Sequence, residues 1–227
     1  MHIVVSTDPL SLLAQNQWIP VSDSGKLKRR RIFNARLMSF DIPTVCSQNE
    51  GYECMTGEVA KFVENTLRSA LSLSIDSLEE EPDNLKAFLN ATCSFRTIPL
   101  RLLDMGSEET LCILLNLYQC LTQHALLIEG APDRNSISQY MRTCCYEIDG
   151  DAFSLADLEF IIRNNMKPPT NAKNTQFVLP PKNLQGRLRQ EIGFVAYDPR
   201  INLVLVSLHS NFKFVSLSDL KILLMIF

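Results

Sequence analysis

Residues 107–130, SEETLCILLNLYQCLTQHALLIEG, constrain the fold of this chain more than any other stretch. Drawn as a helix, the stretch is apolar on nearly every side, which is typical of a helix that other elements surround. Ser107 suits the N-terminal cap, and Gly130 followed by Pro132 suits the end of the helix. We therefore expect a central buried helix, and its polar residues need hydrogen-bond partners. Those residues are Asn116, Gln119, Gln123 and His124.

Composition narrows the class of protein. A hydrophobic content of 46% is enough for a sizeable core, and a net charge of −3 predicts no general attraction to nucleic acid. The longest unbroken apolar run in the central stretch, Leu111 to Leu115, is far shorter than a bilayer core requires, so we expect no membrane span. No signal-peptide pattern opens the chain.

The cysteines favour a reducing compartment. There are seven, and none forms a CxxC pair, so the sequence predicts neither a zinc ribbon nor a thioredoxin-type motif. We expect reduced thiols in a cytoplasmic protein, without metal or cofactor; disulfides in a secreted domain are the alternative.

The first 55 residues differ from the rest. Lys26, Lys28, Arg29, Arg30 and Arg31 form a dense basic run without interleaved aromatic residues. A solvated linker or arm is the favoured interpretation, and a nuclear-localisation patch or a phosphate contact is the alternative. We therefore expect residues 1–55 to be a poorly ordered or partly structured extension, and residues 56–227 to form one domain.

Helical spacing dominates the first part of that domain. It predicts one helix from about Thr56 to Leu71, a second after Pro82, and a short one near residues 136–142. The link over residues 94–106 is apolar enough to lie on the core.

Strand patterns follow the third helix. Residues 144–148 alternate, and Asp149-Gly150 predicts a two-residue hairpin turn. Because of that alternation, only one of Cys144 and Cys145 is expected to face the core. For the other, structural packing is the favoured interpretation, and a surface thiol is the alternative. Ser154 with Asp157 resembles a capping box that opens the next helix.

The last 60 residues predict further strands. A short strand is expected at Gly193–Ala196, a buried strand at Ile201–Leu208 and another at Phe212–Val215, before a helix capped by Ser216. The chain stops on apolar residues at Phe227, so we expect a domain cut short. The predicted fold class is α+β: a helix-rich N-terminal half packed on a small mixed sheet from the C-terminal half, with a central buried helix.

Several short motifs follow one another along the chain. The central helix contains Asn116, Leu117, Tyr118, His124 and Ala125. Further along stand Gly150, Phe153, Ser154, Leu155, Glu159, Ile162, Arg163, Asp198, Pro199, Arg200 and Ile201. In this order and spacing, these residues resemble the pattern of the family of domains of unknown function numbered 547 (DUF547), over roughly residues 60–226.

The chain departs from the family at three positions. Phe160 and Asn202 stand where the resemblance implies histidines, and the LHSNFKF loop lacks the family's cysteine. The resemblance therefore implies a divergent member that has lost the groups suited to acid–base or nucleophilic work.

Two substitutes for the lost groups remain. Cys120 and His124 are four residues apart on one helix, so they share a face and could form a thiol–imidazole pair. His209 lies in the loop that has lost its cysteine. For both, an ordinary structural role is the favoured interpretation.

Polar side chains at the family-motif positions outline a cleft or a structural network. They are Asn116, Tyr118, His124, Glu159, Arg163, Asp198 and Arg200, together with Asn202 in place of the family's histidine. We expect a non-catalytic protein-interaction or scaffold module, a pseudoenzyme in the cytoplasm; the basic run adds a nuclear alternative. The rival functions are a thiol-dependent hydrolase or transferase that uses Cys120 with His124 or His209, and a redox-responsive thiol protein.

Overall fold

A computed structural model describes residues 17–23, 26–35, 52–73, 82–164 and 200–205. Its elements follow the chain in this order: strands β1 (Gln17–Asp23) and β2 (Lys26–Ile32), helices α2 (Tyr52–Ser72) and α3 (Pro82–Ser94), the 3₁₀ turns η1 (Phe95–Thr97) and η2 (Leu100–Leu102), helices α4 (Glu108–Glu129) and α5 (Ile137–Thr143), strands β3 (Cys144–Ile148) and β4 (Asp151–Ser154), and helices α6 (Leu155–Asn164) and α7 (Arg200–Leu205).

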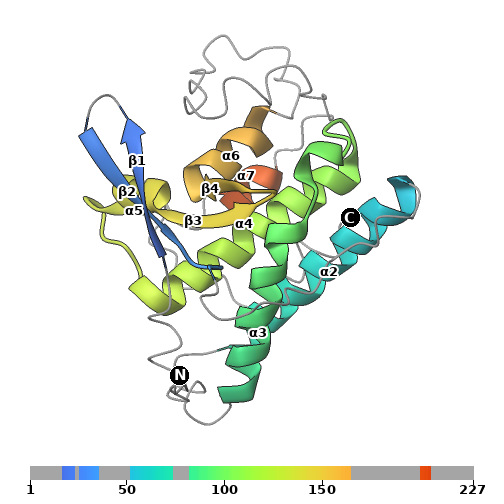
Figure 1. Ribbon diagram of the computed structural model, residues 1–227, viewed down its shortest axis with the longest axis horizontal. Helices are drawn as coiled ribbons and strands as arrows, with labels where there is room; N and C mark the ends of the chain where they lie inside the picture. Colours follow the sequence, from blue (N-terminus) through green and yellow to red (C-terminus); the bar gives the residue numbers. More distant parts are fainter. Residues whose placement is uncertain (1–16, 24–25, 36–51, 74–81, 165–199, 206–227) are drawn as a thin grey trace, which may run out of the picture.

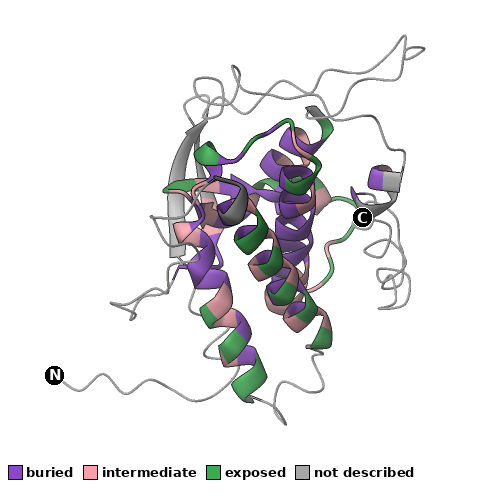
Figure 2. Ribbon diagram, turned by 90° about the vertical axis from the view of Figure 1, so that its right-hand side faces the viewer, coloured by how far each residue is buried: buried purple, intermediate pink, exposed green. Residues whose placement is uncertain are grey.

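The central helix is α4, as the sequence predicts. The Ser107 hydroxyl accepts a hydrogen bond from the Thr110 N–H, and Gly130 ends the helix with a φ of 73°. Helix α2 packs along α4, and α6 and β3 contact it as well. In Figure 1, α4 lies between the β1–β2 hairpin and α2, and Figure 2 shows that it is buried over most of its length. Helix α4 is therefore the core element on which α2, α6 and β3 pack.

By length and composition alone, α4 passes the test for a membrane-crossing helix, and 72% of its most apolar window is buried inside the protein. The core helix of a globular protein passes the same test. The lack of a membrane span therefore stays a prediction.

The sheet has four strands in the order β1-β2-β3-β4. The two outer pairings are antiparallel, whereas β2 and β3 run parallel, so the sheet is mixed. The turn between β3 and β4 is the predicted one: Asp149 and Gly150 have φ angles of 52° and 79°, as a type I′ turn requires. The α+β fold class is confirmed.

Two expectations about this sheet are wrong. The sheet does not come from the C-terminal half alone, because β1 and β2 precede every helix of the structure described. The basic run is not a solvated linker but forms most of β2, where the side chain of Arg30 is only 13% exposed. Strand pairing explains the difference: the partner β3 lies more than 100 residues away, beyond the reach of a local pattern.

Cys144 and Cys145 are both buried, at 2% and 0% exposure, so neither is the surface thiol that was the alternative interpretation. Cys144 joins the main core, whereas Cys145 packs with Ile32 and Ala35 in a small second cluster. The alternation is real, but both faces of β3 are covered, so it does not separate core from solvent.

The expected strand at Ile201–Leu208 is wrong as well, because residues 200–205 form helix α7. Ile201 and Leu205, four residues apart, are buried in the main core. A short apolar run does not by itself distinguish a buried strand from a buried helix, and here packing of an i, i+4 face decided it. The elements predicted at residues 193–196, 212–215 and 216–224 lie outside the described residues.

Candidate functional site

His124 lies in a closed aromatic cage at the sheet side of α4. Its ring centroid is 5.3 Å from that of Phe33, 5.1 Å from that of Phe88 and 5.7 Å from that of Tyr146. The Tyr146 hydroxyl donates to the carbonyl oxygen of Cys120 at 3.2 Å and lies 3.0 Å from His124 Nδ1. With the hydroxyl proton so used, Nδ1 donates to Tyr146 Oη, which places the ring proton on Nδ1.

This setting keeps the imidazole neutral. Burial, and after it the nearby cation of Arg31, lower the pKa of His124 to about 3. The other ring nitrogen, Nε2, is buried and has no hydrogen-bond partner among the described residues. A general base must reach a substrate proton and titrate near the working pH, and this imidazole does neither.

The thiol of Cys120 is equally unreactive in this position. It is fully buried, and burial raises its pKa well above the ordinary value. Among the described residues no hydrogen bond joins it to the His124 ring, whose partner is Tyr146 instead. The two residues share a helix face, but the structure does not bring them together as a nucleophile and a base.

Three further described thiols follow the same trend. Burial raises the pKa of Cys144 to about 12, and it raises that of Cys145 further. Cys112 is half-buried, and its pKa is raised first by burial and then by Glu109 and Glu108. None of these environments favours a thiolate, which is the reactive form.

A second polar group joins α4, α6 and α7 at family-matching positions. Arg163 donates through Nε to Glu159 Oε1 at 2.7 Å and through Nη1 to Asn202 Oδ1 at 2.8 Å. Nearby, the Tyr118 hydroxyl donates to the carbonyl oxygen of Leu205 at 3.3 Å. Burial raises the pKa of Tyr118 strongly, and the charge of Glu159 adds to the rise. This group ties α7 to α6 and α4.

The predicted cleft residues thus divide into two places. Glu159, Arg163, Asn202 and Tyr118 converge, whereas the ring and hydrogen-bond contacts of His124 go to a different set of residues. Asn116 lies on α4 at 9% exposure. Arg200 opens α7, but its side chain, like Asp198 and His209, lies outside the described residues. Within the described ranges, no three His, Cys, Asp or Glu side chains gather to hold a metal ion.

Comparison with known proteins supports the resemblance drawn from these positions. The model of the family described as "Protein of unknown function, DUF547" matches residues 102–212, about half of the chain. Residues 102–212 belong to the DUF547 family. The match is shorter than the predicted span of 60–226, but it contains every residue named above as matching the family. No curated protein matches the chain, and no solved structure does.

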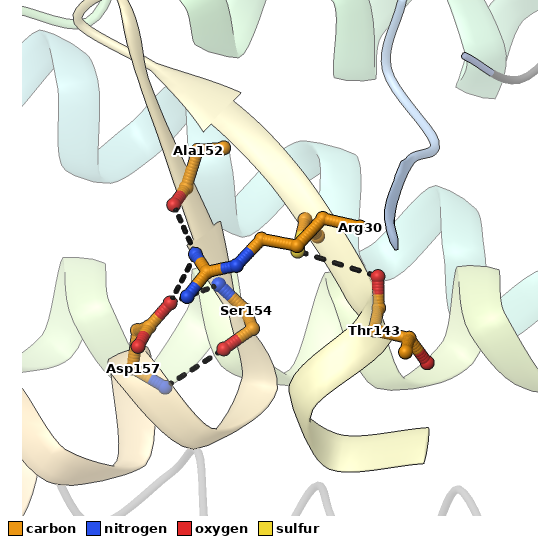
Figure 3. Close-up of polar contacts among 6 residues, drawn as sticks. Arg30, Thr143, Ala152, Ser154 and Asp157 are labelled. Carbon is orange, nitrogen blue, oxygen red and sulfur yellow. Dashed lines mark hydrogen bonds and ion pairs between the residues drawn. The ribbon is translucent and has the colours of Figure 1, made fainter. Parts of the chain in front are cut away.

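Sequence reasoning missed a buried ion pair between the DUF547 segment and β2. Arg30 Nη1 donates to Asp157 Oδ2 at 2.7 Å and to the carbonyl oxygen of Ala152 at 2.8 Å (Figure 3). Asp157 Oδ2 also accepts from the Ser154 N–H at 2.9 Å, while the Asp157 N–H donates to Ser154 Oγ at 3.2 Å. The capping box was predicted, but its ionic partner is 127 residues away and left no local signal.

Asn34 is a second missed residue, and it is completely buried. Its amide nitrogen donates to the carbonyl oxygens of Thr92 at 3.2 Å and Glu147 at 2.9 Å. Its Oδ1 accepts from the Glu147 N–H at 2.8 Å. The Asn34 side chain therefore extends the hydrogen bonding of β3 and joins it to the end of α3.

Proposed function

We propose that this protein is a non-catalytic protein-interaction or scaffold module, a pseudoenzyme within the DUF547 family. The observation that carries the proposal is the state of Cys120 and His124, the best remaining candidates for a nucleophile and a base. The thiol is buried with a raised pKa, and the imidazole is caged with a pKa of about 3. Activating either group would require opening the core.

The losses at the family positions support the same proposal. Asn202 occupies the position of a family histidine, and its side-chain oxygen accepts a hydrogen bond from Arg163. A side-chain amide at this position can orient a neighbouring cation, but it cannot act as an acid or a base near neutral pH. Chemistry at this position is thereby replaced by a contact between helices.

The partner and compartment belong to the same proposal. The five cysteines whose side chains are described are all free thiols, which supports a reducing compartment such as the cytoplasm. We propose a protein partner, since the net charge of −3 offers no general attraction to nucleic acid.

Thiol labelling tests the absence of an activated nucleophile. The folded chain is treated near pH 6 with a mild electrophile, and labelling is followed residue by residue by mass spectrometry. We expect slow labelling throughout, with half-buried Cys112 ahead of fully buried Cys120 among the described thiols. Labelling of the denatured chain, in which all seven cysteines are accessible, gives the reference rate.

The rival thiol-dependent hydrolase makes the opposite forecast. One cysteine would then react orders of magnitude faster than the denatured reference, and His124→Gln or His209→Gln would slow it. Gln retains hydrogen-bonding capacity at position 124 without a titratable ring, which limits damage to the cage. A single hyper-reactive cysteine that either substitution slows would replace the scaffold proposal with an enzymatic one.

A further inference from the structure

The five residues Arg30–Asn34 contact the rest of the protein in the manner of a bound peptide. The strand part of the segment runs parallel to β3, with Arg31 paired to Cys144 and Ile32 to Cys145, and Phe33 and Asn34 form the turn that follows. The Phe33 N–H continues the pairing by donating to the carbonyl oxygen of Cys145 at 3.0 Å. Addition of an extended segment to a free strand edge is a common mode of peptide recognition, in which backbone bonds give affinity and side chains give specificity.

The side chains of Arg30 and Arg31 are recognised through their charge. Arg30 reaches across the end of β3 to Asp157, whose carboxylate is 2% exposed (Figure 3). Arg31 forms an ion pair with Glu129 at the end of α4 and lies over the Phe33 ring at 5.5 Å. Two neighbouring arginines are thus matched to two acidic residues from different helices.

Ile32 and Phe33 are recognised through apolar packing, and Asn34 is recognised through amide hydrogen bonds. Ile32 fills the small apolar cluster with Cys145, and Phe33 covers the His124 ring. Asn34 makes the three hydrogen bonds to Thr92 and Glu147 described above. Each side chain of the sequence Arg-Arg-Ile-Phe-Asn therefore makes a specific contact with the rest of the protein.

Strand pairing between the segment and β3 is short. Seven residue pairs connect β2 with β1, whereas two connect β2 with β3. The segment also lies outside the DUF547 match, which begins at residue 102. Of the residues that contact it, Glu129, Glu147 and Asp157 lie within that match, and Thr92 lies before it.

We propose that the edge of β3 is a peptide-binding site for an Arg-Arg-Ile-Phe-Asn sequence, which the chain's own residues 30–34 occupy and which the same segment of a second copy can occupy in their place. This inference rests on the proposed interaction function, since it names a site and a partner for it. Thiol labelling does not depend on the site, so the two proposals can fail separately.

The first experiment uses the full chain with its own segment weakened. Arg30→Glu places a carboxylate against Asp157, while Lys28→Glu makes the same charge change elsewhere on β2 and serves as the matched control. A fluorescein-labelled peptide of residues 17–35 is titrated with each chain, and binding is followed by anisotropy. We expect the Arg30→Glu chain to bind the peptide at least tenfold more tightly than the wild-type or Lys28→Glu chain, because only there is the site vacated.

The specificity of that binding decides the assignment. Peptides with Arg30→Glu or Asn34→Ala should bind the Arg30→Glu chain at least tenfold more weakly, as should the native peptide when the chain also carries Glu129→Gln. Equal affinity for a scrambled peptide, or no binding by a chain whose circular dichroism remains native, would overturn the proposal.

A nicked chain with native residues tests the same proposal even if the Arg30→Glu chain does not fold. A protease recognition sequence is inserted between Ala35 and Gly51, and the otherwise native chain is cut after folding. We expect the two pieces to co-elute on size exclusion and the labelled peptide of residues 17–35 to exchange into the complex. If the N-terminal piece leaves only when the thermal unfolding transition is lost, or never exchanges, the segment is a permanent part of the fold and the proposal is wrong.

Discussion

Helix α6 carries an ion pair at each end, and the two pairs have the same length and very different surroundings. At the N-terminal end Asp157 meets Arg30 at 2.7 Å, with side-chain exposures of 2% and 13%. Towards the C-terminal end Glu159 meets Arg163 at 2.7 Å, with exposures of 18% and 38%. The difference teaches that distance alone does not rank these interactions: burial, and the distance along the chain between the partners, decide what each does for the fold.

The buried pair should be the costlier one to break. Asp157→Ala leaves the Arg30 cation buried without its counterion and removes the acceptor of the Ser154 N–H. Loss of one partner of a buried pair costs about 3–5 kcal/mol, so we expect a loss of unfolding free energy in that range by denaturant titration. Asp157→Asn is the matched control, because it keeps an acceptor for Ser154 while removing the charge. A loss below about 1 kcal/mol for Asp157→Ala would show that solvent reaches Arg30.

Truncation of a buried leucine on α4 measures how much apolar packing in the core contributes to the free energy of unfolding. Leu117 on α4 is fully buried in the main cluster. Leu117→Ala should cost roughly 2–5 kcal/mol, as buried leucine truncations do, and the same denaturant titration measures it. Leu102→Ala is the natural comparison, since that leucine is 51% exposed, and it should change stability little. Similar small losses for both would contradict the central place of α4.

Acid should weaken the region under β2 before it affects the exposed end of α6. The pKa of His124 is about 3 in the folded protein, below the ordinary value of 6.5 expected on unfolding. Its neutral form is thus favoured by folding: the contribution is complete above pH 6.5 and is lost progressively as pH falls toward 3. Between pH 6.5 and 5 we expect this residue to account for a loss of about 1.5–2 kcal/mol.

Comparison of the wild type with His124→Gln isolates that contribution. The variant has no ring to protonate, so its unfolding free energy should fall less steeply over the same pH interval. Parallel pH profiles for the two proteins would mean that His124 is accessible to protons in the folded state.

The exposed pair should give the smallest effect. Glu159→Gln removes one charge from a partly solvated contact, and such pairs contribute about 0.2–1 kcal/mol. Raising the salt concentration should shrink even that difference between wild type and variant, because exposed charges are screened. A loss comparable to that of Asp157→Ala would show that the Glu159–Arg163 pair stabilises the fold as much as the buried pair does.

The sequence alone determined the features that arise from neighbouring residues. Helix α4, with its Ser107 cap and Gly130 end, follows from apolar spacing and end signals within 24 residues. The Asp149-Gly150 turn and the Ser154–Asp157 capping box are equally local, because the residues that make each contact are within four positions of one another. The DUF547 membership also followed from the order of short motifs along the chain.

Only the tertiary structure decided the features whose partners are distant. Arg30 and Asp157 are 127 residues apart, and a basic run without its partner resembles a solvated arm. The Ile201 segment is a helix because its i, i+4 face packs on the core. Cys145 is buried because Ile32 of the neighbouring strand and Ala35 after it pack in one cluster with it, whereas Cys144 joins the main core. The cage of His124 likewise combines residues from three distant places, Phe33, Phe88 and Tyr146. Local patterns record what a residue prefers, whereas charge pairing, burial and protonation depend on which groups the fold places beside it.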